Sequence, residues 1–165
     1  MTPSLLTDEI RELVGTSSVS EHRVIAEDFQ NWARLVGIID VIHFDTDAAY
    51  ARGFRGLVMP SLYLPHLTRS GPIDPSLLGP DGRRQDAASG VVELPGLHRV
   101  RAGGEEYTFH ELLCAADLVS VTRTVHNITE KEGRAEPFLL VETLTEFHLP
   151  TGLAATFRQT VVALP

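Results

Sequence analysis

The sequence predicts an α+β fold in which helices come first and an antiparallel sheet follows. In the first third of the chain, apolar residues recur at the three- and four-residue spacing of amphipathic helices. From Glu105 onward, four segments alternate apolar with polar residues or are rich in Val and Thr, as strands are. Polar turns at residues 130–134 and 149–152 join the last three segments. Helices followed by consecutive strands around one core are typical of the α+β class.

The helices are predicted from their apolar spacing and their end signals. Phe29 and Ala33 belong to one apolar helix face that Gly37 ends. Pro65 is expected to kink or shorten the helix in which it lies. The predicted helices are residues 5–14, 26–36, 47–52 and 60–68, and residues 17–24 are expected to form an edge strand.

The strands follow a long connection. Residues 71–96 contain many Pro and Gly residues and are expected to form a flexible loop. The strands predicted after it are residues 105–112, 118–129, 138–149 and 153–164.

Length and composition limit the classes of protein. With 165 residues and 43% hydrophobic content, residues 1–165 are expected to form one globular domain. The net charge of −8 argues against nucleic-acid binding, because neutralising phosphates needs clustered basic side chains. The single cysteine, Cys114, excludes an intramolecular disulfide. No apolar run approaches the ~18 residues needed to span a bilayer, and no signal-peptide pattern is evident. We therefore expect a cytoplasmic protein that does not contact membranes.

One segment carries most of the functional information. It begins at Gly37, reaches His43 directly after the aliphatic Ile42, and has a small residue, Ala48, beyond the histidine. This segment resembles the hydratase motif of the MaoC-like hydratases and dehydratases, roughly Gly-Asp-x-Asn-Pro-(Ile/Val)-His followed by Ala or Ser. Ile38 stands where that motif has its catalytic Asp.

A second segment strengthens the resemblance. The run from Gly103 to His110 reads Gly-Gly-Glu-Glu-Tyr-Thr-Phe-His, and Asp117 opens the next predicted strand. It is similar to the corresponding part of the N-terminal half of double-hot-dog dehydratases. Two separated motifs are a more specific signal than either alone. The resemblance covers nearly the whole chain and implies the hot-dog fold, a curled antiparallel sheet wrapped around a central helix.

The resemblance also implies acid–base chemistry at His43. In the family, an Asp and a His hold one water molecule and transfer protons to and from the acyl chain. With Ile38 in place of that Asp, the candidate substitute is Asp40. If residues 40–43 form one helical turn, the side chains of Asp40 and His43 lie on the same side; if they are extended, the two face apart. The simpler alternatives remain open: a packed loop histidine and a solvated carboxylate.

The thioester site is expected at the start of the central helix. The resemblance implies that backbone N–H groups there bind the thioester carbonyl, and these would be the amides of Ser61 and Leu62, just after Pro60. Met59, Leu62 and Tyr63 would line the acyl pocket, although the same residues could face the core.

Together, these features imply a subunit of a (3R)-hydroxyacyl-thioester dehydratase or enoyl hydratase. Its substrate would be an acyl-CoA or acyl-ACP in fatty acid or polyketide metabolism. Since the acid is missing at Ile38, we expect an acyl-binding partner of a catalytically complete hot-dog chain. The alternatives are a non-catalytic acyl-binding or scaffold protein, and a self-sufficient homodimeric hydratase that uses Asp40 and His43.

Dimerisation is expected through a sheet edge. Unpaired strand edges tend to be covered or paired, so a heterodimer or homodimer would join near residues 107–112 or 119–125. The histidines show no metal-ligand spacing, and we expect neither a metal nor a cofactor.

Overall fold

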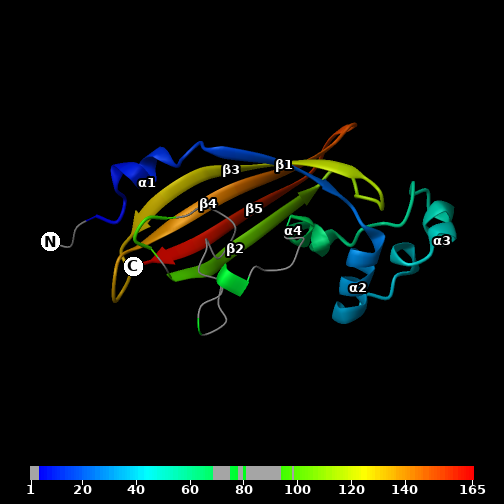
Figure 1. Ribbon diagram of the computed structural model, residues 1–165, viewed down its shortest axis with the longest axis horizontal. Helices are drawn as coiled ribbons and strands as arrows, with labels where there is room; N and C mark the ends of the chain where they lie inside the picture. The colour runs from blue at the N-terminus through cyan, green and yellow to red at the C-terminus, as the bar shows by residue number, and fades with distance from the viewer. Residues whose placement is uncertain (1–3, 69–74, 78–79, 81–93, 98) are drawn as a thin grey trace.

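The computed structural model describes residues 4–68, 75–77, 80, 94–97 and 99–165. Its main feature is a five-stranded antiparallel sheet with the strand order β1-β3-β4-β5-β2 (Figure 1). The strands are β1 (Ser17–Arg23), β2 (Arg99–Phe109), β3 (Leu118–Lys131), β4 (Phe138–Leu149) and β5 (Gly152–Leu164). The predicted α+β class is confirmed, and the predicted strands are present; β2 begins earlier than expected.

One face of the sheet is buried, as the alternating pattern predicted. In β4 the buried side chains occupy every second position, from Leu139 to Leu149. The register aligns Leu139 with Ala163 and Val141 with Val161, and all four side chains are at most 3% exposed. Because successive strand residues point to opposite faces, this register gathers the apolar positions of neighbouring strands on one side.

The helices are short. They are α1 (Asp8–Glu12), α2 (Ala26–Val36), α3 (Thr46–Ala51) and α4 (Leu64–Leu67), with 3₁₀ turns η1 (Val41–His43), η2 (Ser61–Tyr63) and η3 (Pro75–Leu77). The bounds of α2 agree with the prediction, and Gly37 ends it in the left-handed conformation with φ 80°. Residues 5–14 form a shorter helix than predicted, because Thr7 caps it by accepting the Ile10 N–H at 3.3 Å.

The predicted central helix, residues 60–68, is divided into two pieces. A 3₁₀ turn, η2, precedes α4, in which Pro65 occupies one of the first positions. Proline has no N–H to donate to the Ser61 carbonyl, so an α-helical bond cannot form there. Leu64 donates to Ser61 instead, in the tighter 3₁₀ pattern. The expected kink or early stop at Pro65 is thus a change of helix type.

Two apolar clusters fill the buried side of the sheet. In the first, Phe29 of α2 and Leu64 of α4 pack on Val119, Phe147 and Phe157 of the sheet. In the second, at the other end, Ile10 of α1 packs with Leu94, Leu97 and residues of β3, β4 and β5. Apart from residues 75–77, 80 and 94–96, the predicted loop 71–96 lies outside the described residues.

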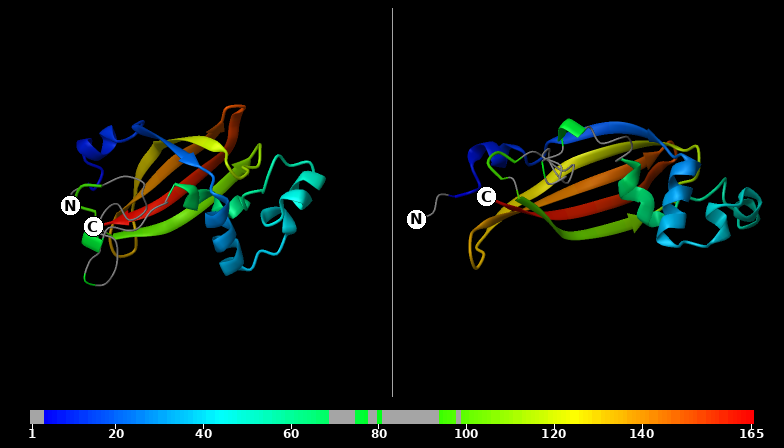
Figure 2. Two further views of the ribbon diagram at one scale, coloured as in Figure 1. Left: turned by 45° about the vertical axis from the view of Figure 1, so that its right-hand side comes forward. Right: turned by 60° about the horizontal axis from the view of Figure 1, so that its bottom comes forward.

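One part of the chain projects from the sheet. Residues 26–56, named the overhang here, carry α2, η1 and α3 beyond the end of the sheet where β2 terminates (Figures 1 and 2). The overhang contains the first motif, and residues 57–60 connect it to η2. None of the helices in the described part of the chain is long and apolar enough to cross a membrane.

Candidate active site

His43 is the last residue of η1, and its ring is held by the backbone of a neighbouring segment. The Nδ1 atom lies 2.7 Å from the carbonyl oxygen of Val58. A carbonyl oxygen can only accept a hydrogen bond, so Nδ1 carries the proton and donates it. In the neutral ring, Nε2 is then unprotonated and can accept a proton from a substrate or from water. The half-buried ring thus has the tautomer that a general base requires.

The Val58 carbonyl is itself well positioned. The Val58 N–H donates to the Ile42 carbonyl at 3.1 Å, which ties residues 42 and 43 to this segment. On the other side of Val58, the Met59 N–H donates to the Leu113 carbonyl and the Ala115 N–H donates to the Leu57 carbonyl, both at 2.8 Å. Residues 57–59 are therefore held by backbone hydrogen bonds. Val58 is 1% exposed. His43 therefore bonds to a rigid backbone segment two residues before Pro60, beside the start of η2.

Asp40 has other partners than His43. It is the N-cap of η1, where one carboxylate oxygen accepts the Ile42 N–H at 3.3 Å. Both carboxylate oxygens also accept from the Arg52 guanidinium, at 2.8 and 3.0 Å. The Ile42 N–H and then Arg52 lower the pKa of Asp40. An ionised carboxylate with these partners is poorly suited to donate a proton, and a catalytic role for Asp40 stays a prediction.

Ile38 occupies the position at which the family has its catalytic Asp. Ile38 is half-buried, and its N–H donates to the Ala33 carbonyl at 2.9 Å as the chain leaves α2. Its neighbour Ile39 is 89% exposed. The side chain of Ile38 has no ionisable group, so the described structure offers His43 no acid partner at this position.

The start of η2 presents two backbone donors. Tyr63 donates to the Pro60 carbonyl at 2.9 Å, but the preceding N–H groups of Ser61 and Leu62 have no acceptor within the described residues. The first N–H groups of a helical segment lack internal partners and can bind a ligand oxygen. Pro60 is buried, whereas Leu62 is 62% exposed. The binding of a thioester carbonyl by these amides stays a prediction.

The predicted pocket residues separate into two groups. Met59 is 2% exposed and belongs to the first apolar cluster, so its side chain supports the core of the described chain instead of lining a cavity. Tyr63 is half-buried in an aromatic group, 5.6 Å from both Trp32 and His66 between ring centroids. Burial, followed by the charge of Asp28, raises the pKa of Tyr63.

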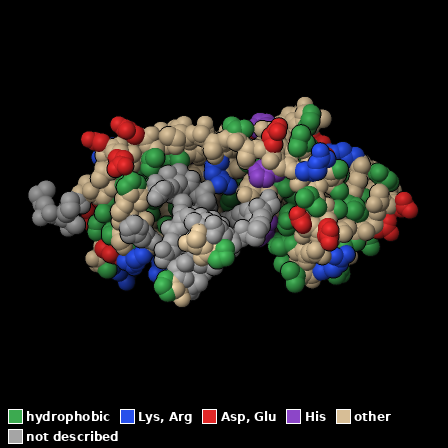
Figure 3. Space-filling model, in the orientation of Figure 1, with side chains coloured by type: hydrophobic (Ala, Val, Ile, Leu, Met, Phe, Trp, Pro, Cys, Tyr) green, Lys and Arg blue, Asp and Glu red, His purple; other side chains and the backbone are tan. Residues whose placement is uncertain are grey.

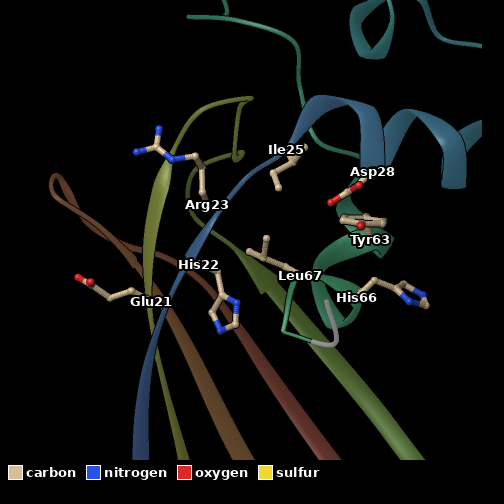
Figure 4. A pocket seen from close by; sticks show the side chains of 8 residues that line it. All are labelled: Glu21, His22, Arg23, Ile25, Asp28, Tyr63, His66 and Leu67. Carbon is tan, nitrogen blue, oxygen red and sulfur yellow. The ribbon is translucent and has the colours of Figure 1, made fainter. Parts of the chain in front are cut away.

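Tyr63 lines a small cavity between β1 and α4. Its volume is about 180 Å³, and His22 and Leu67 point into it while Glu21 and Arg23 point away (Figure 4). This volume is below the roughly 300–1,000 Å³ of pockets that enclose drug-sized ligands. His43 is not among its lining residues, so the described chain does not bring the histidine and this cavity together.

Two residues that the sequence analysis did not single out, Arg55 and Glu111, join Asp117 in an ion-pair cluster. The guanidinium of Arg55 donates through Nε and Nη2 to the Asp117 carboxylate and through Nη1 to Glu111, the last at 2.7 Å. The hydrogen bonds that Arg55 donates to Asp117 raise the pKa of Arg55. Asp117 was noted only as the acid that opens a strand, and no local spacing connects it with Arg55, 62 residues earlier.

Cys114 is buried beside this cluster. Burial raises the pKa of its thiol, which disfavours the reactive thiolate form. Among the described residues, no group of three His, Cys, Asp or Glu side chains could hold a metal ion.

Most of the chain matches a known protein family. Residues 12–152 match the family described as "FAS1-like, dehydratase domain region". The chain belongs to the MaoC-like dehydratase family. This membership confirms the resemblance of the two motifs, and it places the chain among the hydratases and dehydratases of the hot-dog class. A search of curated protein sequences finds no match.

Solved structures show the fold. The HadBC (3R-hydroxyacyl-ACP dehydratase) complex of Mycobacterium tuberculosis aligns with a TM-score of 0.69 at 18% identity, over 91% of this chain and 96% of that chain. The ChsH1–ChsH2 complex of the same organism gives 0.68 at 19% identity, over 94% and 96%. The (R)-hydratase of A. caviae gives 0.63 at 22% identity, over 92% and 96%. The predicted hot-dog fold is confirmed.

Proposed function

We propose that this MaoC-like chain is a subunit of a (3R)-hydroxyacyl-thioester dehydratase or enoyl hydratase acting on acyl-CoA or acyl-ACP. In this proposal it supplies acyl-binding surface to a hot-dog partner chain that carries a complete catalytic pair. The observation that carries the proposal is a positioned base without its acid: the Nδ1–H of His43 donates to Val58, while Ile38 stands in the acid position.

The chemistry assigned to this site is addition or removal of water. In hydration, Nε2 of His43 accepts a proton from water as the water oxygen bonds to the β-carbon of an enoyl thioester. Negative charge then develops on the thioester oxygen, which the Ser61 and Leu62 N–H groups can stabilise. The α-carbon must finally receive a proton from an acid. Ile38 cannot supply it, and losing such a group typically costs ~10²–10⁴ in rate.

Several features support a partner chain. The cavity beside Tyr63 is small, and the overhang exposes apolar side chains, including Leu35 at 86% and Ile39 at 89%. Hydrophobic side chains gather over this region in Figure 3. Exposed apolar patches commonly mark interaction surfaces. The HadBC and ChsH1–ChsH2 structures are both described as complexes.

Two alternatives are retained. A non-catalytic acyl-binding or scaffold protein would need neither His43 nor the amides of η2. A self-sufficient homodimeric hydratase would use Asp40 with His43, and the bonds from Arg52 and the Ile42 N–H to Asp40 argue against it.

An assay of crotonyl-CoA and longer enoyl-CoA hydration discriminates among the three. We expect little activity from the purified chain and high activity when it is mixed with a hot-dog chain captured from the native host. A Tyr63→Ala subunit should then raise KM for long acyl chains in the mixture, whereas Glu12→Ala, at an exposed position of α1 outside the expected seam, should not. Full activity of the isolated chain that His43→Ala abolishes would instead establish the homodimeric hydratase. Absence of both activity and acyl-thioester binding would establish the scaffold.

A further inference from the structure

We propose that the Arg55–Asp117 ion pair is a positioning device that keeps His43 in the tautomer with the proton on Nδ1. The tautomer claim stands on geometry alone, while its catalytic consequence rests on the proposed function. Arg55 and Asp117 are positioning residues in this proposal, because they act on the base through the backbone of residues 57–59.

The pair has the geometry of a directional bond. Two guanidinium nitrogens of Arg55 face the two carboxylate oxygens of Asp117, with Nε at 3.2 Å from Oδ1. Such two-point contacts fix orientation as well as distance. The Asp117 side chain is 14% exposed, against 44% for that of Arg55, so the carboxylate end of the pair is the more shielded one.

Asp117 organises the loop before β3. One of its carboxylate oxygens also accepts the Cys114 N–H at 2.7 Å, and its own carbonyl accepts from Val24 at 2.9 Å. Glu111, the second partner of Arg55, accepts from the Thr151 hydroxyl at 3.0 Å. The guanidinium thus links the overhang to the two turns that flank the end of the sheet.

The same loop holds the segment that bonds to His43. Val58 forms an antiparallel bridge with Cys114, and the flanking bonds join Met59 to Leu113 and Ala115 to Leu57. Arg55 lies three residues before Val58 and anchors the segment where it enters this pairing. If the anchor is removed, the Val58 carbonyl can shift, and the imidazole can then exchange between its two neutral tautomers.

The other ion pair near His43 has a different role. Arg52 bonds to Asp40 at the start of η1, and both side chains are about half exposed. That pair stabilises the turn that carries His43, and its hydrogen bonds involve Ile42 and not residues 57–59. Arg55 bonds instead to Asp117, which also accepts the N–H of Cys114, the residue bridged to Val58. The loss of Arg55 should therefore reach the hydrogen bond at Nδ1 through this paired backbone.

The experiment measures the imidazole nitrogens of neutral His43 in protein labelled with ¹⁵N-histidine. Their chemical shifts report which nitrogen carries the proton. Wild type should show the proton on Nδ1. Arg55→Gln and Asp117→Asn should shift the population toward Nε2–H, and Arg55→Lys, which keeps the charge but loses the two-point contact, should give an intermediate shift.

Arg99→Gln is the matched control. Arg99 bonds to Glu136 at 2.8 Å with similar exposure, at the opposite end of β2 from the site, and its replacement should leave His43 unchanged. The signals of His126 on β3 report whether each variant is folded. Unchanged His43 shifts in folded Arg55→Lys and Asp117→Asn would overturn the proposal, even if Arg55→Gln fails to fold.

Turnover gives a second, separable result. In the Ile38→Asp protein, where hydration of crotonyl-CoA would depend on His43 of this chain, adding Arg55→Lys should lower kcat/KM by about 10- to 100-fold, the usual cost of a small misplacement. A tautomer shift without any measurable activity would support the positioning role and count against the proposed function. An unchanged tautomer in an active assembly would support the proposed function and count against the positioning role.

Discussion

His43 and Ile38 determine what chemistry this chain can perform alone. The histidine has one nitrogen committed to the Val58 carbonyl and the other available as a base. A base alone can activate water, but protonation of the α-carbon also needs a donor in reach. Ile38 fills the donor position with an aliphatic side chain that is half-buried as the chain leaves α2.

The first prediction restores the donor. Ile38→Asp should raise hydration of crotonyl-CoA by the isolated protein, by up to about 10²-fold, because it supplies one proton-transfer group. Initial rates at saturating substrate would measure the gain. Ile39→Asp is the matched control: it adds the same charge one residue away at a position that is 89% exposed, and it should leave the rate unchanged. An equal gain in both variants, or none in a folded Ile38→Asp protein, would contradict the missing-acid explanation.

The second prediction concerns the acid dependence of stability. The Ile42 N–H and then Arg52 lower the pKa of Asp40 in the folded protein from the ordinary value of 3.8. A lowered folded pKa adds stability that is present above pH 3.8 and is lost as the pH falls through the folded pKa. Asp40→Asn should therefore be less stable than wild type at pH 7, and the difference should shrink toward pH 3.

Urea unfolding at a series of pH values measures this difference. Asp47→Asn, in the first turn of α3, leaves the Arg52 pair intact and is expected to show a smaller pH dependence. If the difference in the free energy of unfolding between wild type and Asp40→Asn stayed constant from pH 7 to pH 3, the ionised carboxylate would not be stabilised by its hydrogen bonds.

At the scale of elements, the end of α2 sets the direction in which the chain enters the first motif. Gly37 ends the helix with φ 80°, and its N–H donates to the Arg34 carbonyl at 3.3 Å. The left-handed conformation turns the chain toward Ile38 and η1. Glycine adopts this conformation without the steric cost that a Cβ atom brings.

The third prediction isolates that backbone requirement. Gly37→Ala should lower the free energy of unfolding by about 1 kcal/mol, because the left-handed conformation costs a non-glycine residue roughly this much. An added Cβ would meet no atom within 4 Å, so the cost comes from the backbone alone. Gly104→Ala in β2 has equally open space without a positive φ and should be nearly neutral in the same urea titration. A neutral Gly37→Ala would mean that α2 can end in another way.

At the scale of the whole molecule, the strand order defines two sheet edges. β1 covers β3 from Leu118 to Thr124, so the alternative seam at residues 119–125 is not a free edge. The physical reason is that β1 uses the hydrogen-bonding groups on that side of β3. Within the described sheet, β2 is the edge that contains the second motif, and residues 107–109 of the remaining seam lie on it.

The fourth prediction tests β2 as the seam. Amides of β2 that do not bond to β5 should exchange slowly with deuterium if another chain pairs with them, and quickly in a monomer. We expect protection of residues 99–109 to increase with protein concentration, together with a dimer mass in light scattering. The opposite edge, residues 17–23, is the internal control and should not change.

Two results would contradict a dimer seam at β2. A strictly monomeric protein at ~100 μM would mean an association free energy weaker than about −5 kcal/mol, and a shared site between two copies would lose its basis. Concentration-dependent protection of β1 in place of β2 would move the seam to the other edge.

Local sequence determined the class of fold and most of its elements. The alternation in residues 138–149 predicted β4, and the apolar spacing with Gly37 predicted α2, because both depend on neighbours within a few residues. The two motifs likewise identified the family from contiguous residues. Sequence reasoning was less accurate for residues 60–68, which form a 3₁₀ turn followed by a four-residue α-helix in place of one continuous helix.

Tertiary structure alone decided which partners the site residues have. Asp40 could face His43 or turn away, and Arg52, 12 residues later, takes its carboxylate. Met59 could line a pocket or the core, and the sheet buries it. The tautomer of His43 depends on Val58, and the segment around Val58 depends on a loop more than 50 residues further along the chain. Contacts of this kind join residues whose separation in sequence carries no periodic signal, so only the folded chain brings them together.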